Sequence, residues 1–188
     1  MTTRPPTDYA MDPALRPIAR EPLSAPIRLD PYDPAWPRVF AQLAAGIEAA
    51  LGATAVAIHH AGSTSVPGLS AKPVIDFVLV VPDPNDEAAY LPALEAIGYR
   101  LHMREPDWFS HRLIKRDDPA VNMHVFADGC PEIDRMLAFR DWLRAHDDER
   151  RLYEAEKRRL ATKTWAYVQD YADAKSGVVE AIIARASR

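Results

Sequence analysis

The sequence predicts a single α+β domain in which helices pack against a mixed β-sheet, and three observations lead to this fold class. The first patterned segment of the chain has apolar residues at helical spacing. Strand-like segments follow it, with one short helix among them. The C-terminal part again has apolar residues at helical spacing. Elements in this order build a sheet with helices packed on it. With 188 residues, 48% of them apolar, the chain can bury one core of ordinary size.

Residues 1–26 are predicted to be a flexible, proline-rich N-terminal arm. Six prolines are spread through this stretch, and no apolar periodicity accompanies them. A segment of this composition buries too little apolar surface to offset the entropy lost on ordering. We therefore place the single folded domain, including its C-terminal helices, at residues 27–188.

The first helix of the domain is predicted to end near Gly52, a residue suited to a helix C-terminus. Its start is marked either by Asp33 as the N-cap with Pro34 in the first helical position, or by Pro37. Residues 27–30 precede it as a short strand or extended lead-in.

Two strands and a helix are expected next. Residues 55–60 form the first strand, and residues 73–81 form a second one that is apolar and β-branched on both faces. Such a strand belongs at the centre of a sheet that is covered on both sides. A helix over about residues 86–97 stops at Gly98, although Pro92 disfavours an unbroken course.

Three further strands are predicted over residues 99–104, 108–116 and 121–127. The turns between them are short, which favours antiparallel neighbours. Two or three helices should occupy about residues 131–185. Within them, residues 147–159 carry charges of both signs at three- and four-residue spacing, which is typical of an exposed helix face with internal ion pairs.

Composition and charge limit the partners of this protein. The formal net charge is −4, so the totals give no support for binding to nucleic acid or to an anionic membrane. The single cysteine, Cys130, cannot form an intrachain disulfide and is expected to be an ordinary free thiol. No apolar run approaches the roughly 18 residues of a membrane span, and no secretory leader is visible. We expect a soluble cytoplasmic protein.

The segment between the first two strands has the composition of an anion-binding loop. Gly62 allows close approach of the backbone, Ser63, Thr64 and Ser65 supply hydroxyl and N–H donors, and Lys72 adds a positive charge. A phosphate group would fit such a loop. The alternative is a tight turn in which the hydroxyls bond only to neighbouring backbone groups.

Asp76 lies in the middle of the apolar second strand, where an unpaired charge costs several kcal/mol. Two interpretations stay open for it. The carboxylate either accepts hydrogen bonds from the loop and holds it in place, or it binds a metal or cofactor. By alternation, Asp76 shares its face of the strand with Val74, Val78 and Val80.

The chain resembles the GrpB family from about residue 27 to residue 167. The resemblance rests on the segment HHAGSTSVPGLSAKPVIDFVLVV, preceded by DPAWPRVF and followed by VNMHVF and LAFRDWLRAH. It implies a nucleotidyltransferase-like fold, related to the DNA polymerase beta superfamily, and relatives that are sometimes joined to a dephospho-CoA kinase. In that superfamily a Gly-Ser loop holds the triphosphate. A strand with acidic residues two apart, helped by a third acid on a later strand, binds two divalent cations.

The resemblance places the superfamily's Gly-Ser loop at Gly62 and Ser63, and its first acid at Asp76. The position of the second acid holds Val78, and on the later strand we expect His124 to face Asp76. A lone Asp with His is a poor site for Mg²⁺, which prefers oxygen ligands. We therefore expect Mg²⁺ or Mn²⁺ to bind weakly, through Asp76 and the ligand's phosphates.

Three further residues are site candidates with an ordinary alternative. His60 precedes the loop and is expected to line the site, unless a backbone carbonyl simply satisfies it; its neighbour His59 should point to the other face. Arg112 or Lys115 could bind phosphate if its face of the hairpin lines the cleft. Otherwise both belong to a solvated strand face.

These observations support a protein that binds a nucleotide or another phosphorylated small molecule in a Gly-Ser loop cleft and that could be a metal-dependent nucleotidyltransferase. In that reaction His60 or His124 would activate the acceptor. The alternative is a non-catalytic module that binds a ligand or a partner and has lost its metal pair, which Val78 favours. A metal-dependent hydrolase built on Asp76 and histidines has less support, because no histidine pair has a standard ligand spacing.

Overall fold

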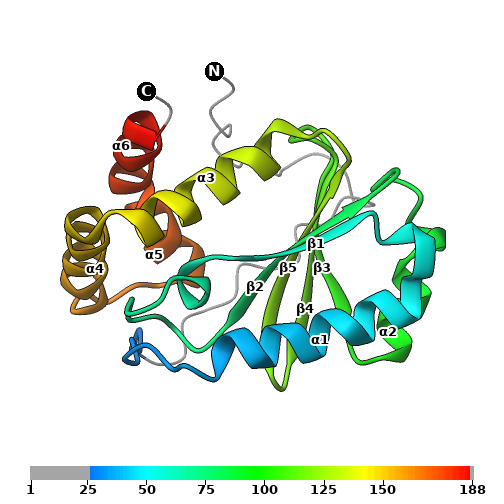
Figure 1. The fold of residues 1–188 in the computed structure, drawn as a ribbon, viewed down its shortest axis with the longest axis horizontal. Helices are drawn as coiled ribbons and strands as arrows, with labels where there is room; N and C mark the ends of the chain where they lie inside the picture. Colours follow the sequence, from blue (N-terminus) through cyan, green and yellow to red (C-terminus); the bar gives the residue numbers. More distant parts are fainter. Residues whose placement is uncertain (1–25, 187–188) are drawn as a thin grey trace.

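The computed structural model describes residues 26–186, and it shows a five-stranded sheet with helices on both faces (Figure 1). The strand order is β1-β2-β5-β4-β3. The expected arm, residues 1–25 with Pro26, lies almost wholly outside the described residues. The α+β class with a mixed sheet and a helical C-terminal section is confirmed.

The five strands are β1 (Ala57–Ala61), β2 (Ile75–Val81), β3 (Arg100–Glu105), β4 (His111–Asp117) and β5 (Ala120–Ala127). The β2 and β5 strands run parallel at the centre of the sheet, whereas the other three pairs are antiparallel. The short turns before β4 and β5 therefore join antiparallel neighbours, as the sequence predicts.

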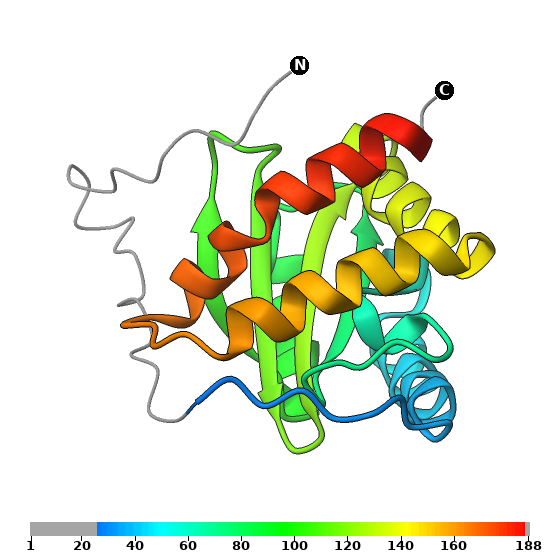
Figure 2. The same ribbon diagram turned by 90° about the vertical axis from the view of Figure 1, so that its left-hand side faces the viewer.

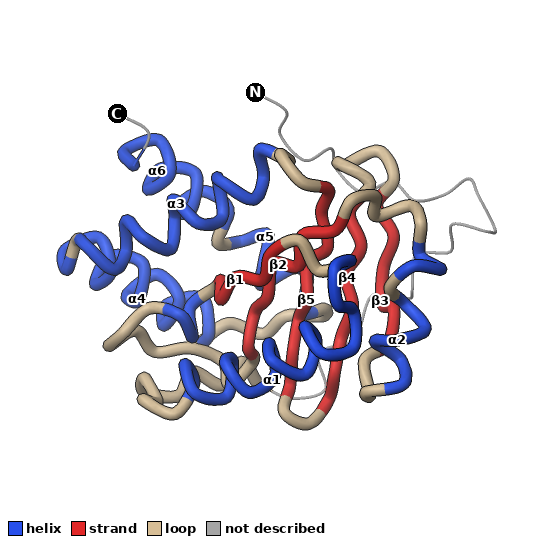
Figure 3. Tube along the Cα trace, turned by 45° about the vertical axis from the view of Figure 1, so that its right-hand side comes forward, coloured by secondary structure: helices blue, strands red, loops and turns tan. Residues whose placement is uncertain are grey.

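The α-helices are α1 (Trp36–Leu51), α2 (Leu91–Ala96), α3 (Pro131–Ala145), α4 (Asp147–Ala161), α5 (Val168–Ala174) and α6 (Ser176–Ala186). The first two lie along one face of the sheet, and the C-terminal four gather on the other (Figure 3). In Figure 2, α4 and α6 cross in front of the strands. Among the described residues, no helix is long and apolar enough to cross a membrane.

Both faces of β2 carry apolar side chains, and helices cover the sheet on both sides to bury them. On one face, Ile75, Phe77 and Leu79 pack with residues of α1 and α2 in the largest core cluster. On the other, Val78 and Val80 pack against residues of α3. The prediction of a central, doubly covered strand is thereby confirmed, and Asp76 lies on the second face, beneath the C-terminal helices.

Several predicted boundaries differ from the observed ones. The first helix starts at Trp36, with Pro37 in its first turn, and not at Pro34. The expected helix over 86–97 is split into a 3-10 turn (Glu87–Ala89) and the six-residue α2, with Pro92 placed in the first turn of α2. A proline there removes no helical hydrogen bond, so the chain restarts the helix at this point.

Two other segments differ from a predicted strand. Residues 27–30 form no strand and contribute an isolated bridge between Asp30 and Ala71, so the alternative of a lead-in describes them better. Strand β4 begins at His111 and not at residue 108, because Phe109 and Ser110 both adopt positive φ, at 54° and 51°. Residues in this conformation turn the chain and cannot continue a strand.

Candidate functional site

A polar row crosses the sheet on the face that carries Asp76. Asn122 is the cross-strand partner of Asp76 on β5, and Lys115 is the partner of Asn122 on β4. The Asn122 Nδ2 donates a hydrogen bond to Asp76 Oδ1 at 3.1 Å. His124, which was expected to face Asp76, lies two residues further along β5, opposite Val78. All of these side chains are only partly buried, apart from that of Val78.

Gly62 begins the loop after β1 and lies directly against Asp76. Its φ is +64° and its ψ −172°, a combination that only glycine adopts without strain. A Cβ atom at this position would lie 2.0 Å from Asp76 Oδ2. Glycine is therefore required both by the backbone conformation and by the close approach of the carboxylate.

Ser63 is the loop hydroxyl that meets the C-terminal helices. Its Oγ accepts a hydrogen bond from Lys157 Nζ at 3.1 Å, and Ser63 also shares a side-chain hydrogen bond with Tyr153. Both partners lie on α4 and are buried. The serine hydroxyl is thus held at the point where the loop, β2 and α4 come together.

The other two loop hydroxyls bond within the loop and its neighbours. Thr64 Oγ1 donates to the Val74 carbonyl at 3.3 Å, and Ser65 Oγ donates to the Gly62 carbonyl at 2.6 Å. Both side chains are almost completely buried. Thr64 and Ser65, predicted as ligand-binding residues, therefore act in this structure as the tight turn that the sequence left as the alternative.

His60 lies on the opposite face of the sheet from Asp76, which corrects the expectation that both line one site. Its ring stacks on Phe40 of α1 with centroids 4.5 Å apart, and its Nε2 bonds to Thr64 Oγ1 at 3.1 Å. Burial, with smaller effects from two arginines of α3, lowers the pKa of His60 to about 4. By alternation along β1, it is His59 that faces the side of Asp76.

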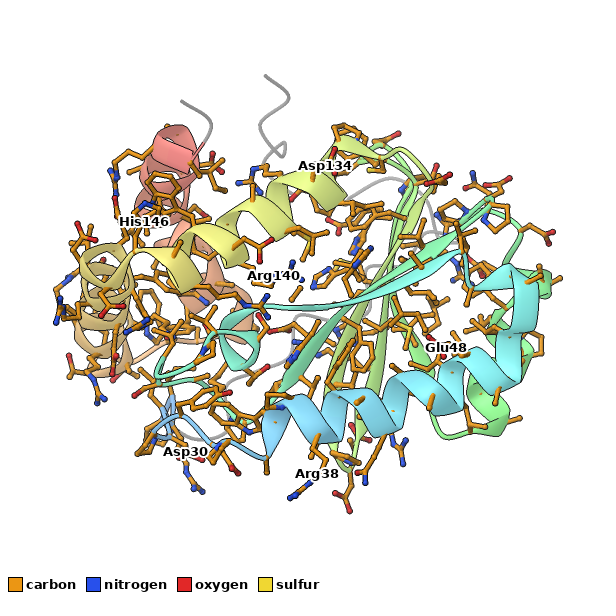
Figure 4. The ribbon with its side chains drawn as sticks, viewed as in Figure 1. Asp30, Arg38, Glu48, Asp134, Arg140 and His146 are labelled. Atoms are coloured by element: carbon orange, nitrogen blue, oxygen red, sulfur yellow. The ribbon has the colours of Figure 1, made fainter. Side chains whose placement is uncertain are left out.

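Two arginines of α3 fix the backbone around the loop. Arg140 Nη1 donates to the His60 carbonyl at 3.0 Å, and Figure 4 shows this side chain between α3 and β1. Arg144 donates through Nε and Nη2 to the Ser65 carbonyl, at 3.0 and 2.8 Å. These charge-assisted bonds attach α3 to both ends of the Gly-Ser loop.

Three lysines from different parts of the chain surround Asp76. Lys72 follows the loop, Lys157 lies on α4, and Lys175 caps α5. Burial raises the pKa of the Asp76 carboxyl above its ordinary value, and the hydrogen bond from Asn122 and the charges of the three lysines offset this rise only in part. The ammonium groups of Lys72 and Lys175 lie over the same ring, that of Tyr171, at 5.7 and 4.7 Å from its centroid. Lys72, Lys157 and Lys175 thus lie close enough to Asp76 for their charges to act on its carboxyl group.

Lys157 is the most deeply buried of these lysines, with 2% of its surface exposed. Its Nζ also donates to the Ser70 carbonyl. Burial, together with the nearby charge of Lys175, lowers its pKa to about 7, from 10.5. Burial of a charged amine lowers the free energy of unfolding. A buried lysine beside the Gly-Ser loop therefore suggests a role other than stability.

Neither Lys157 nor Lys175 was found from the sequence. The charge pattern of residues 147–159 predicts an exposed helix face, but Lys157 lies on the buried stripe with Tyr153 and Leu160. Those residues stand four before and three after it, so helical spacing carries the signal. Lys175 gives no comparable signal, because the short α5 that it caps was not predicted as a separate helix.

Of the two basic candidates on the hairpin, only Lys115 shares the face of Asp76. Arg112 is buried on the other face, where its Nε donates to Glu87 Oε1 at 2.8 Å and its Nη2 to Asn85 Oδ1 at 3.1 Å. Arg112 therefore links β4 to the segment before α2 and, contrary to the prediction, does not belong to the site on the Asp76 face.

The donor set around Asp76 does not fit a divalent cation. Within residues 26–186, no group of three or more His, Cys, Asp or Glu side chains is arranged to hold a metal ion. The neighbours of Asp76 are an amide and three amines, and the position expected for a second acid holds the buried Val78. Hard cations require several oxygen ligands, which the protein alone does not supply here.

The comparisons with known proteins agree on one family. A family model described as GrpB protein matches residues 26–185. The chain is 53% identical over 167 residues to the UPF0157 protein BH1888 of Halalkalibacterium halodurans, a match that covers 89% of this chain and 86% of that protein. The crystal structure of conserved protein GrpB from Enterococcus faecalis is 28% identical with a TM-score of 0.67, and the match covers 82% of this chain and 98% of that one.

A more distant relative carries an enzyme name. A dephospho-CoA kinase of Mycolicibacterium paratuberculosis is 34% identical over 176 residues. The match covers 80% of this chain but 42% of that protein. The similarity thus concerns less than half of the kinase.

Proposed function

Because this chain belongs to the GrpB family, with its Gly-Ser loop and Asp76 in place, we propose that it binds a phosphate-bearing small molecule, a nucleotide above all, on the sheet face beside Gly62 and Ser63. The observation that carries this proposal is the hydrogen bond from the buried Lys157 Nζ to Ser63 Oγ at 3.1 Å. The ammonium groups of Lys72 and Lys175 lie together over the Tyr171 ring, and the charges of all three lysines act on Asp76. A phosphate bound beside these three amines would favour their protonated forms, and their charges would neutralise it.

The burial of Lys157 supports the same conclusion. An amine whose pKa is lowered to about 7 is only partly protonated at neutral pH. A phosphate anion in contact with it would favour the charged form and raise this pKa again. Among the described residues, no carboxylate forms a direct ion pair with Lys157. Burial of this amine lowers stability, and binding of an anion would offset that cost.

The distant kinase relative favours a nucleotide over inorganic phosphate. Its name states that it acts on dephospho-CoA, which contains a nucleotide. For this chain we propose binding of the same general class of compound. Nucleotidyl transfer by two cations held on the protein is not part of the proposal, since the donor set does not fit them.

A second candidate function is a binding module without catalysis. Val78, which is completely buried, stands at the position where a second acid would be needed. A site that retains the anion-binding lysines and lacks the second carboxylate would bind a phosphorylated ligand or a phosphorylated partner without transforming it. Turnover of bound ATP separates this candidate from an enzyme.

Calorimetric titration with ATP and with inorganic phosphate, each in Mg²⁺ and in chelator, tests the proposal. We expect Lys157→Met and Lys175→Met to weaken binding about tenfold or more, since a hydrogen bond to a charged group contributes about 1.5–3 kcal/mol. Lys163→Met is the matched control, because Lys163 is exposed and lies near Trp165. Equal affinities in all four proteins would refute the proposal.

A further inference from the structure

A chain of hydrogen bonds links three ionisable side chains on adjacent strands. His111 Nδ1 lies 2.8 Å from Glu105 Oε2, and His111 Nε2 lies 3.0 Å from His124 Nδ1. Glu105 and His111 are cross-strand partners on β3 and β4, and His124 follows on β5. The two imidazole rings are stacked with centroids 5.1 Å apart. This chain was not predicted from the sequence, where His124 alone was a candidate.

The inner part of the chain is shielded from water. Glu105 is 6% exposed and His111 is 2% exposed, whereas His124 is only partly buried. Trp108 packs its ring edgewise against His111, and Phe126 lies against it at 4.8 Å between centroids. A carboxylate buried in this way requires a hydrogen-bonding partner, which His111 provides.

The direction of these bonds determines which nitrogen of His124 accepts a proton. An ionised carboxylate only accepts hydrogen bonds, so His111 donates through Nδ1. In neutral His111 the Nε2 is then the acceptor, and His124 donates to it through Nδ1. This tautomer makes the Nε2 of His124 the basic nitrogen.

A proton taken up at His124 Nε2 can be passed inward. Transfer of the Nδ1 proton of His124 across the 3.0 Å bond makes His111 an imidazolium. That cation then lies 2.8 Å from the Glu105 carboxylate, which stabilises it. The positive charge thereby moves away from the ligand face into a buried ion pair.

The outer end of this chain lies beside the candidate site. His124 follows Asn122 by two residues on β5, and alternation places both on the face that carries Asp76. Side chains two residues apart on a strand lie about 7 Å from each other. A group bound over Asp76 and Asn122 is therefore within reach of His124.

We propose that Glu105, His111 and His124 form a proton relay that serves the phosphate site, with His124 as the proton acceptor and the other two as positioning residues. The proposal rests on the proposed function. In transfer of a phosphoryl group, the oxygen of an acceptor hydroxyl forms the new bond to phosphorus and its proton passes to His124 Nε2. The bond from phosphorus to the leaving oxygen breaks, and its electron pair stays with the leaving group.

Nitrogen-15 NMR of the full chain tests the relay without any need for turnover. The chain has six histidines, and the spectrum of His124→Asn assigns the resonances of His124. We expect neutral His124 to carry its proton on Nδ1. In the double variant Glu105→Gln/His111→Phe, which removes the acceptor without leaving a buried charge, His124 should change to the Nε2-protonated form. A proton on Nε2 in the wild type, or an unchanged tautomer in the variant, would overturn the relay.

Addition of ATP connects the relay to the site. We expect ATP to shift the His124 Nε2 resonance in the wild type and not in Lys157→Met, while the tautomer is the same in both proteins. If ATP binds in a Lys157-dependent way and leaves His124 unmoved, the relay does not serve this site and the inference is wrong. If ATP does not bind but the tautomers are as expected, the proposed function fails and the proton path from Glu105 to His124 stands alone.

Discussion

Lys157 Nζ lies 3.1 Å from Ser63 Oγ and so joins the middle of α4 to a loop 94 residues earlier in the chain. The bond places a buried amine at the point where the Gly-Ser loop approaches β2. It also makes the C-terminal helices part of the site, which the loop and the strand alone do not complete.

The burial of Lys157 should be visible in the pH dependence of stability. Its pKa is about 7 in the folded protein and ordinarily 10.5, so the unfolded chain binds more protons between these values. The stability of the wild type therefore gains from this group as the pH rises through that window. Lys157→Met lacks this contribution. In urea denaturation, the free energy of unfolding of the variant should therefore fall behind that of the wild type as the pH rises from about 7 to about 10. Parallel pH profiles of the two proteins would contradict a lowered pKa for Lys157.

Gly62→Ala is expected to destabilise the protein strongly for two reasons. The added Cβ would lie 2.0 Å from Asp76 Oδ2, and the alanine would have to adopt the positive φ of this position. Gly98→Ala is the matched control: Gly98 also has a positive φ, at +90°, but open space around its Cα. We expect a loss of about 1–2 kcal/mol for the control, typical of a strained backbone, and a clearly larger loss for Gly62→Ala. Chemical denaturation of both variants measures the difference, and equal losses would show that the contact with Asp76 costs nothing.

Variants in and after the loop should separate binding from stability. Lys72→Ala is expected to weaken ATP binding with little change in stability, since its side chain is proposed to contact the ligand. Ser63→Ala should weaken binding and also cost about 1–3 kcal/mol, because it removes a hydrogen-bond partner of the buried Lys157 amine. Thr64→Val should also cost about 1–3 kcal/mol, because it removes a buried hydroxyl that bonds to His60 and to the Val74 carbonyl. Calorimetry and thermal melts of the same variants test both halves. Unfolding of Ser63→Ala would show that Ser63, too, belongs only to the turn.

Asp76→Asn distinguishes a phosphate site from a metal site. If phosphate binds directly to the lysines, removal of the neighbouring negative charge should tighten ATP binding measured in chelator, since like charges no longer repel. If Asp76 holds a cation, the variant should lose the part of the affinity that Mg²⁺ or Mn²⁺ provides. Asp128→Asn, an exposed substitution in the turn after β5, is the control. Weaker binding in chelator would count against both interpretations.

The N-terminal arm remains a prediction, because residues 1–25 lie outside the described residues. We expect a chain that starts at Ile27 to fold and melt like the full chain. Ile27 itself is 8% exposed and packs with Leu160 and Tyr171, so Ile27→Ala should cost about 2–4 kcal/mol. Thermal denaturation of the two proteins tests the boundary, and a cooperative melt that requires the arm would move it towards the N-terminus.

The local elements of this protein are determined by its sequence alone. The doubly apolar pattern of residues 73–81 specifies a central covered strand, and the short turns after β3 and β4 specify antiparallel neighbours. The Gly-Ser loop and the isolated Asp76 are also evident, because a flexible residue beside hydroxyls, and a charge in an apolar strand, are local anomalies. These features depend on neighbours within a few positions, which a linear pattern records.

Tertiary structure decided which of the candidates meet. Alternation shows that His59 and His60 point to opposite faces, but only the pairing of Ala61 with Asp76 shows which face of β1 corresponds to which face of β2. The same holds for Arg112, which pairs with Glu87 on the far face. Lys157, Lys175 and the chain from Glu105 to His124 join segments distant in sequence. A site of this kind is defined by packing and strand register, and both arise from the whole fold and not from the spacing of residues.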